Sequence, residues 1–376
     1  MRWSLVTDKT ERDYLACLER ADTPMGQHAL GYQNALAECP HEEPLRIVAY
    51  KGKAPVGAAA GMLYSGGPLR MVESLPFGYG GAISPLSGAA RQGCLAFLCD
   101  ALVTVARRAD ARLLSIQTPP FPDGPAAYRD AFRPDFELLS FIQYVDLTGD
   151  WRKRLRRNHR RNVARAERYG LTAGCEASAE ALDRCCELQH KRMAEVGGRA
   201  RPDAFFRGLH RHMLPEGTGW FFYAKMAKKG SDPIFRKMGS DPFFVSGTPL
   251  IGVRDVLDVL LICMDSAARD MQPNALLCLR AMQWAAERGF RRFNFQSSLR
   301  RGDSLYRWKL GWGAQEAPVS IMTRVIGEVE PLLRMPLSEL REAYTYHYVL
   351  PYPVLEAARA GRPIDSPELR VLEKGA

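Results

Sequence analysis

Hydrophobic and polar positions recur with two different periods along the chain, and the changes of period predict its elements. Alternating or continuously apolar runs of strand length predict strands, and apolar residues three or four positions apart predict helices. The predicted strands cover residues 45–51, 55–63, 112–117, 136–147, 219–226, 256–264 and 319–326. The predicted helices cover residues 10–21, 27–38, 89–109, 151–169, 178–193, 202–213 and 337–346. Because strands alternate with helices, the pattern favours an α/β (α+β) fold with mixed sheets flanked by helices.

The densest succession of signals lies between Asp270 and Gly313. Pro273 suits the first position of a helix, where its missing N–H costs nothing, and apolar residues continue at helical spacing to Gly289. A short strand follows, with phenylalanines on one face and polar residues on the other. Its phenylalanines are Phe293 and Phe295, and its polar residues are Asn294 and Gln296. A turn that contains Trp308 and Lys309 closes the stretch.

The order of these pieces resembles the C-terminal half of the Fem-type aminoacyltransferases and their acetyltransferase-like relatives. The pieces are the run Pro273–Leu277, the helix end Gly289-Phe290, the strand 293–297 and the turn Trp308-Lys309-x-Gly-x-Gly. Proteins of that group are similar to two GNAT acyltransferase domains fused in one chain. The resemblance therefore implies tandem GNAT-like domains at residues 1–150 and 151–330, followed by a C-terminal extension at 331–376. The proline-interrupted tail of this extension is expected to be less ordered.

The same resemblance implies where a donor and a substrate bind. The donor-binding candidates are Lys309, Asn274 and Ser297, and the family lysine at the position of Lys309 meets a phosphate of the tRNA acceptor end. The alternative for Lys309 is a surface lysine flanked by a structural tryptophan. The substrate-pocket candidates are Asn294, Gln296, Tyr306, Trp308 and, from a glycine-rich loop of the first half, Tyr79. No nucleophilic triad or metal-ligand spacing is visible, so no catalytic residue is assigned and no metal is expected.

Charge adds a further candidate surface. The formal net charge is +10, from 52 Lys and Arg against 42 Asp and Glu, which favours an anionic partner. The densest positive stretch is residues 151–169, where Arg157, Arg160 and Arg161 are candidates for anion binding. A solvated linker helix explains these arginines as well, because their long apolar stems suit such a position. His159 is expected to be a surface residue.

Acetyl-CoA or another acyl-CoA is the expected donor, with aminoacyl-tRNA as the alternative. GNAT enzymes hold coenzyme A with a glycine-rich loop before the corresponding helix, but residues 268–272 contain no glycine. Fem-type relatives share this departure, and some of them use aminoacyl-tRNA. The donor therefore stays open between the two.

The resemblance implies an N-acyltransferase that passes an acetyl or aminoacyl group to an amine of a small molecule or of a cell-envelope precursor, as in peptidoglycan biosynthesis. The alternative is a nucleic-acid-binding or envelope-biosynthesis accessory protein with a vestigial acyl pocket. A charged start, apolar runs shorter than ~20 residues and nine unpatterned cysteines predict a cytoplasmic, bacterial protein without an integral membrane segment.

The near-repeat GSDPIF/GSDPFF predicts a repeat-like insertion near 227–247 without a catalytic role. The oligomeric state is not predicted.

Overall fold

A computed structural model describes residues 1–22, 24–122, 124–226, 243–298, 300–364 and 366–372. The chain forms two compact units: unit 1 comprises Met1–Ile142 and Ala317–Ala376, and unit 2 comprises Gln143–Glu316. The predicted domain boundaries at 150 and 330 stay a prediction, since compactness does not show which segments fold independently. Most of the predicted insertion, residues 227–242, lies outside the described residues, and 243–247 begin a strand.

Unit 1 contains a mixed sheet. Its strands follow one another in the sheet as β1 (Arg2–Leu5), β2 (Glu42–Lys51), β3 (Ala54–Tyr64), β4 (Met71–Ser74), β6 (Leu113–Gln117), β14 (Gln315–Val325) and β7 (Phe136–Asp146). The strand β5 (Gly81–Ile83) pairs with β3, and β15 (Leu369–Val371) pairs with β7. The β4–β6 pair is parallel, whereas β2 and β3 form a long antiparallel hairpin. The predicted mixed sheet is therefore confirmed for this unit.

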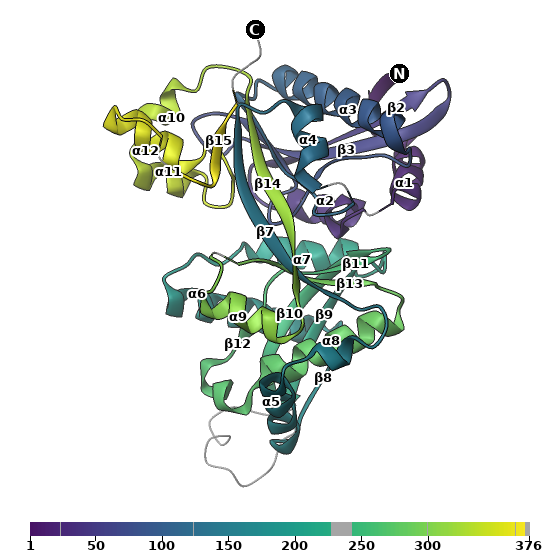
Figure 1. Ribbon diagram of the computed structural model, residues 1–376, viewed down its shortest axis with the longest axis vertical. Helices are drawn as coiled ribbons and strands as arrows, with labels where there is room; N and C mark the ends of the chain where they lie inside the picture. The colour runs from purple at the N-terminus through teal and green to yellow at the C-terminus, as the bar shows by residue number, and fades with distance from the viewer. Residues whose placement is uncertain (23, 123, 227–242, 299, 365, 373–376) are drawn as a thin grey trace. The chain divides into compact units, whose positions relative to one another are not determined.

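Helices cover the sheet of unit 1 (Figure 1). They are α1 (Glu11–Arg20), α2 (Leu30–Ala37) with the preceding turn η1 (Gly26–His28), α3 (Gly88–Arg108), α4 (Gly124–Phe132), α10 (Glu330–Arg334), α11 (Leu337–Ala343) and α12 (Tyr352–Ala360). Among the described residues, α3 alone is long and apolar enough to cross a membrane, but half of its apolar window is buried inside the protein. Because its buried face packs into the core under β2 and β3, α3 is explained as a core helix.

The described part of the C-terminal segment forms three helices and a short strand, which differs from the expectation of a less ordered tail. Its helices α10–α12 bury Leu332, Leu340 and Leu355 in a separate apolar cluster of unit 1. Tyr344 fixes this segment further, because its hydroxyl donates to the carbonyl of Leu69 (2.7 Å) and accepts from the amide of Leu69 (2.9 Å). Two prolines of the tail, Pro351 and Pro353, stand at the start of α12, where they are favourable.

A buried ionic cluster joins the C-terminal segment to the sheet of unit 1. The Nδ1 atom of His347 lies 3.0 Å from the Glu73 carboxylate, and its Nε2 atom lies 3.2 Å from the Glu42 carboxylate. All three side chains are at most 6% exposed, and the imidazole stacks on Tyr64 at a centroid distance of 3.9 Å. Burial alone would lower the pKa of His347, but the two carboxylates raise it to about 9. The imidazolium is thus the stable form at neutral pH.

The strands of unit 2 also combine parallel and antiparallel pairing. Its strands follow one another as β13 (Arg292–Ser297), β11 (Val256–Val259), β10 (Phe243–Val253), β9 (Gly219–Met226) and β8 (Leu171–Cys175), and β12 (Cys263–Met264) pairs with β10. Its helical segments are η2 (Trp151–Arg154), α5 (Arg157–Arg168), α6 (Ala179–Val196), α7 (Asp203–Gly208), η3 (Leu209–Met213), η4 (Ser266–Met271), α8 (Pro273–Glu287) and α9 (Ser304–Gly311). The β11–β13 pair is parallel, and β10 pairs antiparallel with β9 and β11.

The helix α8 organises the core of unit 2. It packs against β8, β9 and β10 and against α5. Its fully buried residues include Leu276, Leu277, Cys278 and Met282. Each large apolar side chain buried in this way contributes roughly 1.5–3 kcal/mol. Because this core fixes α8, it also fixes the position of the first turn of the helix.

Three local predictions in unit 2 need correction. The segment expected as one helix over 151–169 is broken at Leu155, which is extended between η2 and α5. The strand expected over 256–264 is two strands, since the chain leaves β11 after Val259 and pairs with β10 from Cys263. The turn expected at Trp308 and Lys309 is the helix α9, because the Asp303 carboxylate caps it by accepting from the amide of Tyr306 (2.6 Å).

Candidate active site

The parallel strands β11 and β13 lose their pairing in the middle of unit 2. Their register runs from Val256 opposite Arg292 to Asp258 opposite Asn294 and then ends. Asn294 is fully buried, its Nδ2 atom donates to the Asp258 carboxylate at 2.5 Å, and its Oδ1 atom accepts from the backbone amide of Gln296 at 2.9 Å. Gln296 adopts a left-handed backbone with φ of 60°, which turns the chain away from the strand direction. Asn294 therefore closes the paired part of the sheet.

The first turn of α8 contacts β10, the neighbour of β11 in the sheet. Gln272 occupies the N-cap position, and Pro273 and Asn274 begin the helix. The Asn274 Oδ1 atom accepts a hydrogen bond from the Ser246 hydroxyl at 2.6 Å, which ties the helix start to β10. The first amides of a helix have no partner within it and carry a partial positive charge. This end of α8 is therefore suited to an anionic group.

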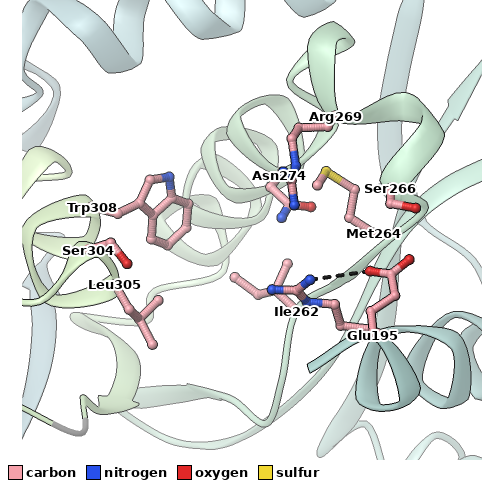
Figure 2. A pocket seen from close by; sticks show the side chains of 10 residues that line it. Glu195, Ile262, Met264, Ser266, Arg269, Asn274, Ser304, Leu305 and Trp308 are labelled. Carbon is pink, nitrogen blue, oxygen red and sulfur yellow. Dashed lines mark hydrogen bonds and ion pairs between the residues drawn. The ribbon is translucent and has the colours of Figure 1, made fainter. Parts of the chain in front are cut away.

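A pocket of about 400 Å³ opens beside Asn274 (Figure 2). Its apolar walls are Ile262, Met264, Leu305 and Trp308, and its polar walls are Arg192, Glu195, Ser266, Arg269, Asn274 and Ser304. These residues come from α6, the segment from Ile262 to η4, the start of α8 and the first turns of α9. All of them belong to unit 2. The pocket thus offers an apolar side for an acyl chain and a charged side for polar groups.

Two charged groups on α6 face each other at the pocket. The Arg192 guanidinium donates to the Glu195 carboxylate at 3.2 Å, as Figure 2 shows. A hydrogen bond from Ser266, followed by the effect of Arg192, lowers the pKa of Glu195, so its side chain stays ionised. Arg269 has no ion pair within the described part of the chain and stands four residues before Pro273. The free positive charge of the pocket therefore lies near the start of α8.

Lys309 lies in the interior, so its interpretation as a surface lysine is wrong. It is 4% exposed, and its Nζ donates to the carbonyls of Gln296 (3.0 Å) and Ser297 (2.7 Å). Burial lowers the pKa of this ammonium to about 8, although Asp303 opposes the shift. Lys309 thus holds the end of β13, where the strand leaves the sheet, and its neighbour Trp308 lines the pocket. Contact of Lys309 with a donor phosphate stays a prediction.

The remaining predicted site residues do not line the pocket. Gln296 is half-buried, and its Nε2 atom has no hydrogen-bond partner within the described chain. Ser297 is exposed and contributes its carbonyl to Lys309. The Tyr306 hydroxyl donates to the Glu316 carboxylate at 2.7 Å, and Tyr306 does not line the pocket. Tyr79 is fully buried in unit 1 and does not line it either.

The basic helix α5 exposes its arginines. Arg157, Arg160 and Arg161 are exposed and form no ion pair within the described residues. His159 is 7% exposed, so the expectation of a surface histidine is wrong. Its position four residues before Val163 places both on the face of α5 that packs against the core. That spacing is the sequence signal that identifies His159 as buried.

Sequence reasoning missed most of the pocket wall. Arg192 and Glu195 lie about eighty positions before α8 in the chain, on a helix whose sequence carries no site motif. Arg269 had a signal, because a basic residue close before a proline-started helix adds its charge to the positive end of the helix, and the two together attract an anion. Elsewhere in the described residues, no group of three or more His, Cys, Asp or Glu side chains is arranged to hold a metal ion.

The pair β11–β13, the helix α8 and the pocket at its first turn all belong to unit 2, and the comparison with known families covers the same part of the chain. Residues 153–310 match the family model described as "Acetyltransferase (GNAT) domain". The predicted resemblance to the Fem-type and GNAT group is thereby confirmed. None of the curated proteins matches the chain.

Solved structures extend the likeness to both units. FemX superposes with a TM-score of 0.68 at 14% identity, covering 89% of this chain and 99% of FemX. A tandem GNAT protein from the clavulanic acid biosynthesis pathway gives 0.55 at 16% identity, covering 87% and 99%. L-PGS from Bacillus licheniformis gives 0.53 at 13% identity, covering 90% and 97%. At these identities the likeness shows the fold, so the predicted tandem GNAT fold is confirmed.

Proposed function

We propose that this protein is an N-acyltransferase that passes an acetyl or aminoacyl group to an amine of a cell-envelope precursor or a small molecule. The observation that carries the proposal is the pocket of about 400 Å³ at the start of α8, within a GNAT-family domain. Acyl transfer between two bound substrates needs positioning and a polarised carbonyl rather than a covalent intermediate. A cytoplasmic, bacterial location and a role in envelope biosynthesis belong to this proposal.

The lining residues fit a donor that has an anionic part and an acyl arm. Arg269 and the first turn of α8 attract phosphate groups, and Ile262, Met264 and Trp308 provide an apolar wall for the arm. A bound acyl-CoA or aminoacyl-tRNA supplies the activated acyl group. The Asn274 Oδ1 atom accepts the hydrogen bond from Ser246. This bond does not use the Nδ2 group of Asn274, which can donate to a substrate. The absence of the glycine-rich loop before Pro273 leaves aminoacyl-tRNA as the alternative donor.

Replacement of Arg269 with alanine is expected to weaken acetyl-CoA binding about tenfold or more, because charge-assisted hydrogen bonds to phosphate contribute ~1.5–3 kcal/mol. The measurement is calorimetric titration of acetyl-CoA at physiological salt. Arg280→Ala, on the exposed side of α8, is the control and should leave the affinity unchanged. Equal affinity of Arg269→Ala and the unaltered protein contradicts the assigned anion position.

Competition between donors separates the two branches of the proposal. Saturable acetyl-CoA binding that charged tRNA does not displace supports an acyl-CoA-dependent enzyme. Binding of charged tRNA alone supports aminoacyl transfer. Binding of neither removes the basis for acyltransferase activity and leaves only the fold.

The exposed arginines of α5 favour a second candidate, a nucleic-acid-binding or envelope-biosynthesis accessory protein with a vestigial acyl pocket. Alanine at Arg156, Arg157, Arg160 and Arg161 together should weaken RNA binding and lower the salt slope by up to about 3, since each phosphate contact on a single strand contributes ~0.7. The measurement is fluorescence anisotropy with labelled RNA across a salt series. Acetyl-CoA binding is the internal control, because none of the four arginines lines the pocket. Unchanged RNA affinity in this variant eliminates the α5 surface as the binding site.

A further inference from the structure

The start of α5 and the end of α9 are interlocked through His159. The Nε2 atom of His159 lies 2.9 Å from the carbonyl of Trp308, and the amide of Arg156 donates to the carbonyl of Gly311 at 2.8 Å. The imidazole also packs edge-on against Trp312, with centroids 4.5 Å apart, and lies 5.8 Å from the ring of Trp308. Trp308 lines the pocket and His159 does not, so His159 contacts a residue of the pocket wall without lining the pocket itself.

The imidazole of His159 is tightly packed against α9 at Gly311. A Cβ atom added to Gly311 would lie 2.4 Å from the Cε1 atom of His159 and 2.8 Å from each ring nitrogen. Trp312 is fully buried and packs edge-on against Trp308 at 5.8 Å. Because both neighbours of the imidazole are fixed, the position of His159 is transmitted to the helix that carries Trp308.

The hydrogen bond requires a proton on the Nε2 atom of His159, and burial favours the neutral imidazole. A carbonyl only accepts, so the proton must be on Nε2, and Nδ1 is buried without a hydrogen-bond partner within the described chain. Burial lowers the pKa of His159, the Trp308 carbonyl opposes this, and Arg156 lowers it further. The groups that face the imidazole are Arg156 on its own helix and, on α9, the Trp308 carbonyl and the two indole rings. Protonation would place a second N–H where nothing accepts it.

We propose that His159 is a positioning residue that holds Trp308 in the pocket wall, and that its protonation releases this hold. The sign follows from a folded-state pKa below 6.5: the neutral form is favoured in the native protein, and stability falls as the pH decreases below 6.5. The inference rests on the proposed function only for its effect on donor binding. The position of Trp308 itself is measurable without any ligand.

The test is fluorine NMR of the full-length protein labelled with 5-fluorotryptophan, with the Trp308 resonance assigned through Trp308→Phe. In the unaltered protein this resonance should shift on acidification, with a midpoint below pH 6.5. His159→Gln keeps a donor for the Trp308 carbonyl and should preserve the resonance at pH 7, but it should abolish the titration. His159→Ala should displace the resonance already at pH 7. A Trp308 resonance that His159→Ala leaves in place, or a titration that persists in His159→Gln, overturns the proposal.

The close contact at Gly311 supplies a second, independent test. Gly311→Ala should displace the Trp308 resonance, because the added methyl group overlaps the imidazole. Combining it with His159→Gly removes the overlap, and the resonance of the double variant should then match that of His159→Gly alone. Gly93→Ala is the control, since a Cβ there meets nothing within 4 Å. Identical displacement by Gly311→Ala with and without His159 contradicts the assigned contact.

Acetyl-CoA titration connects the position of Trp308 to the pocket. The affinity should fall at least tenfold in His159→Ala and stay within twofold in His159→Gln at pH 7. If the unaltered protein does not bind acetyl-CoA, the acyl-CoA branch of the proposed function fails while the NMR result still decides the role of His159. The other outcome is that the unaltered protein and His159→Ala bind acetyl-CoA equally well although the Trp308 resonance has moved. Trp308 is then not part of the donor site, and the inferred effect of His159 on donor binding is wrong.

Discussion

His347→Ala should lower the unfolding free energy of unit 1 by about 3–5 kcal/mol, because removal of one partner leaves buried charge without compensation. The substitution would leave Glu42 and Glu73 facing the vacated space with side chains only 6% and 3% exposed. It would also remove the ring that stacks on Tyr64. Hydrogen exchange of peptides from β2–β4 during urea denaturation measures this unit separately from unit 2.

The pH dependence of the same variant gives the sign of the interaction. The pKa of His347 is raised from 6.5 to about 9 in the folded protein. Its stabilising contribution is therefore complete below pH 6.5, decreases between pH 6.5 and 9, and is lost above pH 9, with a total of about 3 kcal/mol. His347→Ala should lack this decline. His41→Asn is the control, since His41 also contacts Tyr64 but is exposed. A loss below ~1 kcal/mol in His347→Ala would show that the cluster is not a net stabilising contact.

Lys309→Met should destabilise unit 2 by about 2–4 kcal/mol and weaken acetyl-CoA binding at least tenfold. The methionine keeps most of the apolar stem, so the lost contribution is that of the ammonium. Its removal leaves the carbonyls of Gln296 and Ser297 without their donor at the end of β13. The measurements are urea denaturation, followed through hydrogen exchange of β13, and calorimetric titration of acetyl-CoA.

The two readouts distinguish a positioning role of Lys309 from direct contact with a donor phosphate. In the positioning role, stability and affinity fall together, because the end of β13 is displaced. In the phosphate role, affinity falls while the stability of unit 2 is retained. Arg307→Ala, an exposed neighbour on α9, is the matched control and should change neither quantity. If Lys309→Met alters neither quantity, both roles are excluded.

The sequence predicts long elements well, because they contain enough residues to show a period. The strand expected at 219–226 has these bounds as β9, and the helix expected from Pro273 begins there as α8. Short strands were not predicted: β4 and β5 have four and three residues, which are too few to show a period. The helix α9 was missed although Asp303 offered an N-cap signal, because two glycines after Lys309 suggested a turn.

The site was predicted only where its residues are close together in the chain. Asn274 and Trp308 were predicted and do line the pocket, since both lie in the stretch that carries the family pattern. Arg192 and Glu195 reach the same pocket from α6, and no local pattern shows which helix faces which. The burial of Lys309 could not be predicted either, because its two acceptors are backbone carbonyls, which every residue possesses.

The chain of unit 1 is interrupted by the whole of unit 2, and this order matters during synthesis. A ribosome completes residues 143–316 before it makes residues 317–376. Until then β6 lacks the strand that later pairs with it, since Ile321–Val325 of β14 lie opposite Leu113–Gln117. Until residues 317–376 are made, the nascent protein therefore has an unpaired strand edge, and such an edge is prone to pair with other chains. A premature stop after residue 316 would leave β6 permanently without this partner, so the truncated protein should aggregate.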